Sequence, residues 1–189
     1  MSPIPGLPTP FTSYINGAWH PVNPARVIVR ENPSRSAETA ARWCPATPDD
    51  ARAALESAAT AASSWTALPL AERAARLTRV LTAVETNASE LAALITRETG
   101  KTLRDSRAEI TSGLADARHA IAEVATHGIV EAASIDEAPV RSKLILEPVG
   151  PCLLVTPWNF PFATILRKLG PALLYGNTAV VKPSCTSLT

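Results

Sequence analysis

Two polar side chains follow short strand-forming runs at positions where a parallel sheet carries its chemistry. Asn159 follows the apolar run 153–156 by three residues. Lys182 directly follows a second run, 179–181. A helix-length stretch, 162–175, separates the runs, and the order strand, loop, helix, strand predicts a parallel βαβ unit. Because ligands bind such units at the carboxyl ends of the strands, we expect the Asn159 amide and the Lys182 cation to face one crevice.

The elements that must hold this unit are predicted to be helical. Thr47 followed by proline is typical of a helix N-cap, Asn87 and Glu90 form a capping pair for a later helix, and Gly100 is a suitable helix end. The predicted helices span residues 47–65, 70–84, 91–99 and 102–126. Their predicted apolar stripes are Leu55, Ala58, Ala59 and Ala62 on the first helix and Leu77, Val80, Leu81 and Val84 on the second. We expect this region to cover a sheet.

Shorter elements flank the helices. The dipeptide Asn16-Gly17 predicts a β-hairpin, and a strand at 27–30 precedes the Asn32-Pro33 turn. Residues 128–139 are predicted to be a connection, and 140–147 an amphipathic strand.

Composition excludes several classes of protein. The 189 residues can form one domain with a substantial core. Because 18 basic residues face 17 acidic ones, with a net charge of +1, no nucleic-acid-binding surface is expected. The three cysteines favour a reducing, cytoplasmic compartment over a disulfide framework. His20, His119 and His127 lack metal-ligand spacing, so no metal site is predicted.

One uncharged run, 149–166, is long enough to suggest a membrane span. Pro151, Pro157 and Pro161 interrupt it, and a helix could not pass through them without losing backbone hydrogen bonds that lipid does not replace. We therefore expect a buried strand and loop in a protein that does not enter the membrane.

Taken together, the motifs resemble the aldehyde dehydrogenase superfamily. They fall in the family's order and cover nearly the whole chain from about residue 14. The matching segments are Tyr14-Ile15-Asn16-Gly17 with Trp19, Asn32-Pro33, Trp65 with Glu72-Arg73, Glu98-Thr99-Gly100-Lys101, Glu147-Pro148-Val149-Gly150, Pro157-Trp158-Asn159-Phe160-Pro161, Pro171-Ala172-Leu173 and the run from Gly176 to Ser184. The run 158–173 is most similar to the succinate-semialdehyde dehydrogenase branch of NADP type.

The resemblance implies an α/β fold, with a helical layer and the start of a parallel Rossmann-like sheet that is incomplete at the carboxyl end. The implied parts are a flexible arm (1–13), a hairpin and helical part of the cofactor domain (14–139), a strand of the oligomerisation arm (140–150) and the first βαβ unit of the NAD(P)-binding domain (151–189). The family's cysteine nucleophile and glutamate base lie beyond the lysine strand. The chain is therefore expected to be the inactive amino-terminal part of a homo-oligomeric enzyme, a dimer or tetramer when complete.

Asn159 corresponds to the family's oxyanion asparagine. An amide aimed at the oxyanion that forms when a thiolate attacks an aldehyde is worth roughly 3–4 kcal/mol. Asn159 could instead cap the helix that begins near Pro161, and either role or both remain open from the sequence.

The resemblance also implies a cofactor site, with Lys182 as its lysine. The implied cofactor-binding residues are Thr156, Pro157, Trp158, Lys182, Ser184 and Cys185. NAD-preferring members commonly carry a glutamate three residues after the lysine, where it takes the ribose 2′-hydroxyl and would repel a 2′-phosphate. Cys185 is uncharged, so we expect NADP, or both cofactors, in preference to NAD alone. Cys185 is not the predicted nucleophile, because its neighbours match the cofactor strand and no histidine lies nearby.

Arg167 interrupts an apolar helix start and is followed by Lys168. In the succinate-semialdehyde branch an arginine at this place binds the distal carboxylate of the substrate, a task that suits a planar guanidinium. The alternative is a salt bridge to a neighbouring helix, with Lys168 in solvent.

The resemblance thus implies NAD(P)-dependent oxidation of a small aldehyde, such as succinate semialdehyde, to a carboxylate. Two alternatives remain: a non-catalytic truncated chain that acts in association or cofactor binding, and an aldehyde dehydrogenase of general aliphatic or aromatic specificity. A reading frame that continues past residue 189 into a glutamate and a cysteine would favour the enzyme.

Overall fold

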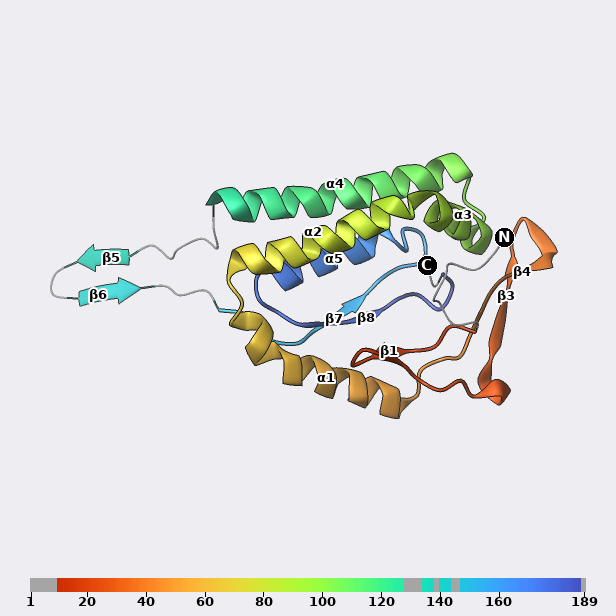
Figure 1. The fold of residues 1–189 in the computed structure, drawn as a ribbon, viewed down its shortest axis with the longest axis horizontal. Coiled ribbons are helices and arrows are strands. Elements are labelled where there is room, and N and C mark those ends of the chain that lie inside the picture. Colours follow the sequence, from red (N-terminus) through yellow and green to blue (C-terminus); the bar gives the residue numbers. More distant parts are fainter. Residues whose placement is uncertain (1–9, 128–133, 138–139, 144–146, 188–189) are drawn as a thin grey trace.

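A computed structural model describes residues 10–127, 134–137, 140–143 and 147–187. Its centre is a parallel strand pair, β7 (Cys152–Val155) and β8 (Ala179–Lys182), joined by helix α5 (Ala163–Leu174). This is the βαβ unit that the sequence predicts. Helices α2 (Leu70–Thr86), α4 (Leu103–His127) and α5 lie on one side of the pair, and α1 (Pro48–Thr66) lies on the other (Figure 1).

Helix α1 begins with the predicted cap, which is a complete capping box. Thr47 Oγ1 accepts a hydrogen bond from Asp50 N at 3.0 Å, and the Asp50 carboxylate accepts one from Thr47 N at 2.7 Å. The backbone bond from Thr47 lowers the pKa of Asp50. The predicted apolar face of the helix is wrong in part, because Ala58 is buried whereas Leu55 is 49% exposed.

Helix α3 (Ala88–Thr99) follows α2 closely. The predicted Asn87–Glu90 cap is wrong: the Asn87 side chain makes no cap bond, and its Nδ2 donates to Ala83 O at 2.8 Å, in the preceding helix. The predicted helix end at Gly100 is confirmed, since this residue has a φ of 76°, which favours glycine.

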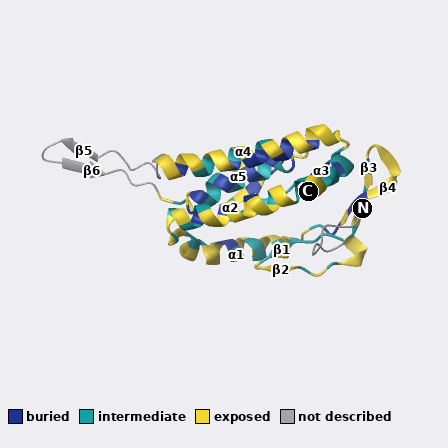
Figure 2. Cartoon of the chain, turned by 45° about the horizontal axis from the view of Figure 1, so that its top comes forward, coloured by how far each residue is buried: buried dark blue, intermediate teal, exposed yellow. Residues whose placement is uncertain are grey.

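The core lies where α2, α3, α4 and α5 meet, and Figure 2 shows the buried residues concentrated between these helices. Its residues are Leu81, Ala92, Ile95, Ile110, Leu114, Ala117 and Leu166. Leu77 is buried beside it, as predicted, but Val80 of the same predicted stripe is 48% exposed. Gly113 lets α4 approach α5 closely, because a Cβ there would lie 3.0 Å from Ala163 Cα.

The amino-terminal part consists of short antiparallel pairs. The predicted hairpin is present as β1 (Tyr14–Ile15) and β2 (Ala18–Trp19), with positive φ at Asn16 and Gly17 as a tight primed turn requires. A 3-10 turn, η1 (Pro24–Arg26), leads to β3 (Ile28–Asn32).

Strand β4 (Arg35–Trp43) pairs with β3 and was not predicted from the sequence. Its alanines have little strand preference, and the bulged register with β3 hides any alternation. Phe11 bridges to this strand, donating to Arg42 O and accepting from Cys44 N at 2.8 Å each, so this part of the expected flexible arm is held. Residues 1–9 of that arm lie outside the described residues.

A second hairpin, β5 (Ser134–Glu137) and β6 (Val140–Lys143), extends away from the helical layers (Figure 1). The prediction that residues 128–139 are only a connection is wrong, because β5 lies within them. The boundary placed at residue 140 therefore falls inside a hairpin. Among the described helices, none has both the length and the apolar character needed to cross a membrane.

Candidate functional site at the carboxyl ends of β7 and β8

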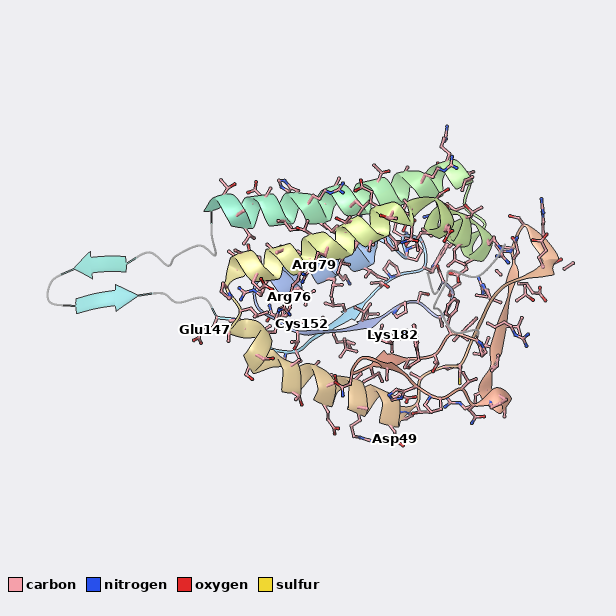
Figure 3. All side chains as sticks on the ribbon, in the orientation of Figure 1. Asp49, Arg76, Arg79, Glu147, Cys152 and Lys182 are labelled. Atoms are coloured by element: carbon pink, nitrogen blue, oxygen red, sulfur yellow. The ribbon has the colours of Figure 1, made fainter. Side chains whose placement is uncertain are left out.

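The predicted site lies at the carboxyl ends of the two parallel strands. Val155 is in register with Lys182, and Thr156 N donates to Lys182 O at 3.2 Å. Figure 3 places Cys152, at the start of β7, and Lys182 at opposite ends of the strand pair. The loop that carries Asn159 therefore leaves the sheet beside Lys182.

Asn159 lies in the loop between β7 and α5, and its side chain is exposed. The capping role left open by the sequence is not observed. The N-cap residue of α5 is Phe162, and no side chain caps the helix from that position. The amides of Phe162 and Ala163 instead donate to Glu109 Oε1, at 2.9 and 3.1 Å. Within the described residues the Asn159 side-chain amide has no hydrogen-bond partner, so it is available to a ligand.

An ion pair between a half-buried lysine and a buried glutamate fixes the backbone of this loop. Lys101 Nζ lies 2.5 Å from Glu109 Oε2 and also donates to Asn159 O at 2.6 Å. The same ammonium lies 4.5 Å from the centre of the Phe160 ring. The Glu109 side chain is 1% exposed, so its carboxylate accepts hydrogen bonds from both Lys101 and the first amides of α5 while shielded from solvent.

Sequence reasoning missed this pair. Lys101 lies in one of the segments that match the family, and the sequence gives it no chemical role beyond that match. The available signal was Glu109, a carboxylate next to Ile110 of the core stripe on a helix that otherwise keeps its charges outward.

The predicted cofactor residues present unused polar groups at the same edge. Thr156 is 4% exposed, and its Oγ1 has no hydrogen-bond partner among the described residues. Lys182 is exposed, and its ammonium donates only to the neighbouring Pro183 O, at 3.1 Å, within the described part of the chain. Ser184 Oγ accepts from Thr186 N at 3.1 Å and keeps its own proton to donate. This donor set fits a ribose or phosphate group.

The remaining predicted cofactor residues are on the surface, since Pro157, Trp158 and Cys185 are all exposed. The loop that carries Cys185 is held to α3 by a second buried contact, in which Ser187 Oγ donates to Glu98 Oε2 at 3.2 Å. Glu98 belongs to the same motif as Lys101 and was likewise given no role from sequence. Residues at the end of α3 and just after it thus contact both loops at this edge of the sheet.

The far end of α5 is held by side chains from the first two helices. Trp65 Nε1 donates to Leu173 O at 3.0 Å, and Arg73 Nε donates to Leu174 O at 2.9 Å. Burial lowers the pKa of Arg73. These bonds satisfy carbonyls at the carboxyl end of α5 and thereby set where β8 begins.

The contacts of Arg167 match the alternative role, a salt bridge to a neighbouring helix. Its Nε lies 2.5 Å from Asp116 Oδ2, and its NH2 group donates to Ser112 Oγ at 3.1 Å, both on α4. Substrate binding by Arg167 stays a prediction. Lys168 is exposed to solvent, as that alternative expects, but its Nζ also donates to Val155 O at 2.6 Å.

The described residues include no group of three or more His, Cys, Asp and Glu side chains placed to hold a metal ion. All three cysteines are free: Cys44 is buried, Cys152 is half-buried and Cys185 is exposed.

Comparison with known proteins defines the class. Residues 19–189 match the aldehyde dehydrogenase family, and the chain belongs to that family. It is 38% identical over 139 residues to the succinate-semialdehyde dehydrogenase of Paenarthrobacter nicotinovorans, covering 74% of this chain and 31% of that protein. It is 35% identical over 174 residues to the D-glyceraldehyde dehydrogenase (NADP(+)) of Picrophilus torridus, covering 90% and 34%.

Solved structures agree with this assignment. The structure superposes on the crystal structure of lactaldehyde dehydrogenase from Escherichia coli with a TM-score of 0.87 and 31% identity, covering 96% of this chain and 38% of that one. The family and the aldehyde dehydrogenase fold are thereby confirmed. The chain spans between 31% and 38% of the length of these three proteins.

Proposed function

We propose that residues 1–189 supply the oxyanion donor and part of the cofactor site of an NAD(P)-dependent aldehyde dehydrogenase. The observation that carries the proposal is the Asn159 side-chain amide, which has no hydrogen-bond partner among the described residues. It belongs to the loop that leaves the sheet beside Lys182, and Lys101 binds the main-chain carbonyl of Asn159. An amide held in this way stabilises the charge that develops on a carbonyl oxygen, because it needs no reorganisation during the reaction.

The reaction class follows from the family. A cysteine thiolate outside residues 1–189 attacks the aldehyde carbon, and the former carbonyl oxygen carries the negative charge toward the Asn159 amide. A nicotinamide cofactor, when bound, would supply the acceptor for the hydride that leaves the aldehyde carbon. A glutamate, also outside these residues, activates the water that releases the carboxylate. Lys182 and Ser184 would hold the adenosine ribose end of such a cofactor, and the Thr156 hydroxyl, buried and without a partner among the described residues, would lie behind it.

For the cofactor we propose NADP, or both cofactors, over NAD alone. The support is chemical: Cys185 places no negative charge beside the Lys182 ammonium, and both side chains are exposed. A 2′-phosphate would meet a cation and a hydroxyl there without repulsion. The P. torridus relative carries NADP(+) in its name.

For the substrate we propose a small semialdehyde, with succinate semialdehyde as the first compound to assay. This rests on the similarity to the P. nicotinovorans protein and not on the Arg167 contacts, since Asp116 already occupies that guanidinium. The ion pair favours a second candidate, a neutral hydroxyaldehyde, and the E. coli lactaldehyde dehydrogenase has a matching fold.

The test uses the full reading frame that contains residues 1–189, expressed beside the 189-residue chain alone. We expect aldehyde-dependent formation of reduced NADP by the full product and none by the short chain. Failure of the full product to reduce either cofactor with semialdehydes or hydroxyaldehydes would contradict the proposal and favour the non-catalytic alternative.

We also propose that the complete protein is a homo-oligomer that associates through the β5–β6 hairpin. The hairpin projects from the helical layers (Figure 1), and an isolated two-stranded hairpin is marginally stable without a partner surface. Sedimentation of the full product should give a dimer or tetramer, and removal of residues 134–143 should reduce it to a monomer.

A further inference from the structure

The partly buried pair of Lys101 and Glu109 connects three elements that meet at the backbone of Asn159. Lys101 follows α3, Glu109 is on α4, and the groups that they bind belong to the loop 159–163. The carboxylate accepts the two amides at the start of α5 with one oxygen and the ammonium with the other. Each partner therefore loses a charge-assisted contact if the other is removed.

These contacts affect the direction in which the Asn159 side chain can point. The main-chain carbonyl of Asn159 accepts a hydrogen bond from Lys101 Nζ at 2.6 Å, and the Phe162 amide at the start of α5 donates to Glu109. With the helix amides satisfied by Glu109, the Asn159 side chain is not drawn into a cap. Asn159, a residue type that favours capping, thus has a side-chain amide without a hydrogen bond to any of the residues that the structure describes.

We propose that Lys101 and Glu109 are positioning residues that hold the Asn159 amide in its oxyanion-binding direction. The inference rests on the proposed function for the role of Asn159. Neither residue touches the reacting atoms, and both act through the loop backbone. Because small misplacements of a catalytic donor are costly, we expect Lys101→Met to lower kcat by roughly 10- to 100-fold while the KM for the cofactor changes little.

A double-mutant cycle in the full enzyme tests the coupling. If Lys101 acts through Asn159, Lys101→Met should lower kcat by less than about twofold in an Asn159→Ala background. An equal loss in both backgrounds, or no loss in the wild-type background, would overturn the proposal. The matched control is Arg118→Met, which breaks the exposed Arg118–Glu85 pair between α4 and α2 and should leave kcat unchanged in either background.

Two further measurements separate positioning from general damage. Lys101→Met combined with Glu109→Gln avoids a buried unpaired carboxylate, keeps an oxygen for the α5 amides, and should still lower kcat. Hydrogen exchange of residues 159–163 should quicken in Lys101→Met and not in Arg118→Met. Hydrogen exchange can be measured on an inactive protein. Unchanged exchange in Lys101→Met would therefore overturn the positioning role. An inactive wild-type protein would by itself contradict only the proposed function.

Discussion

Replacing Asn159 by alanine separates chemistry from stability. Its side-chain amide has no partner within the described residues, and the residue is exposed, so the free energy of unfolding should change by less than about 0.5 kcal/mol. Loss of one oxyanion donor costs about 2.7–4 kcal/mol in the transition state, which lowers kcat by roughly 100- to 1000-fold. The assay is steady-state NADP reduction by the full enzyme, with a deuterated aldehyde to verify that hydride transfer limits the rate.

Asn177→Ala is the matched control, because it removes the same kind of side-chain amide at a position where that amide makes a structural hydrogen bond. Asn177 is buried, and its Oδ1 accepts from Gly150 N at 3.1 Å. Its loss should cost about 1–3 kcal/mol of unfolding free energy, with kcat per folded molecule much less affected. If Asn159→Ala leaves kcat unchanged under chemistry-limited conditions, or lowers stability and kcat in the same proportion as the control, the oxyanion assignment is refuted.

Three other substitutions address specificity and stability. Arg167→Ala should impair succinate semialdehyde roughly ten- to hundred-fold more than a neutral aldehyde of similar length if it grips a carboxylate, whereas equal losses in kcat/KM would assign it to the Asp116 pair. Cys185→Glu should shift the ratio of kcat/KM values toward NAD, and a native enzyme that is strictly NAD-dependent would contradict the reasoning. Asp50→Asn should cost about 0.5–2 kcal/mol at neutral pH by analogy with cap removal. The pKa of Asp50 in the folded state lies below its unfolded value of about 4. Its contribution to the free energy of unfolding is therefore complete above that pH and is lost as the pH falls through the folded pKa. Urea unfolding between pH 3 and 7 should show a smaller pH dependence in the variant.

The local signals in the sequence predicted the elements that depend on local chemistry. Proline at the start of α1, glycine at the end of α3 and Asn-Gly in the first hairpin each act within a few residues, and each was found where expected. Strand β4 was not predicted because it is stabilised by pairing with β3 and by the bridge to Phe11. These contacts cannot be deduced from the alanines of β4 itself.

The sequence predicts that Asn159 and Lys182 follow the ends of their strands but does not predict the contacts that support them, and their roles stay predictions. Asn159 and Lys182 follow their strands, so the parallel topology alone brings their loops to one edge. The Lys101–Glu109 contacts require α3, α4 and the loop to be docked first. The pairing of Arg167 with Asp116 likewise depends on the crossing of α4 and α5, which helical periodicity does not specify.

A crystal structure of the full enzyme with NADP bound would test the central claim most directly. The account predicts the ribose 2′-phosphate beside Lys182 and Ser184, and the Asn159 amide directed at the catalytic cysteine with the Lys101 ammonium still on the Asn159 carbonyl. A cofactor bound away from the carboxyl ends of β7 and β8, or an Asn159 amide turned into the start of α5, would contradict it.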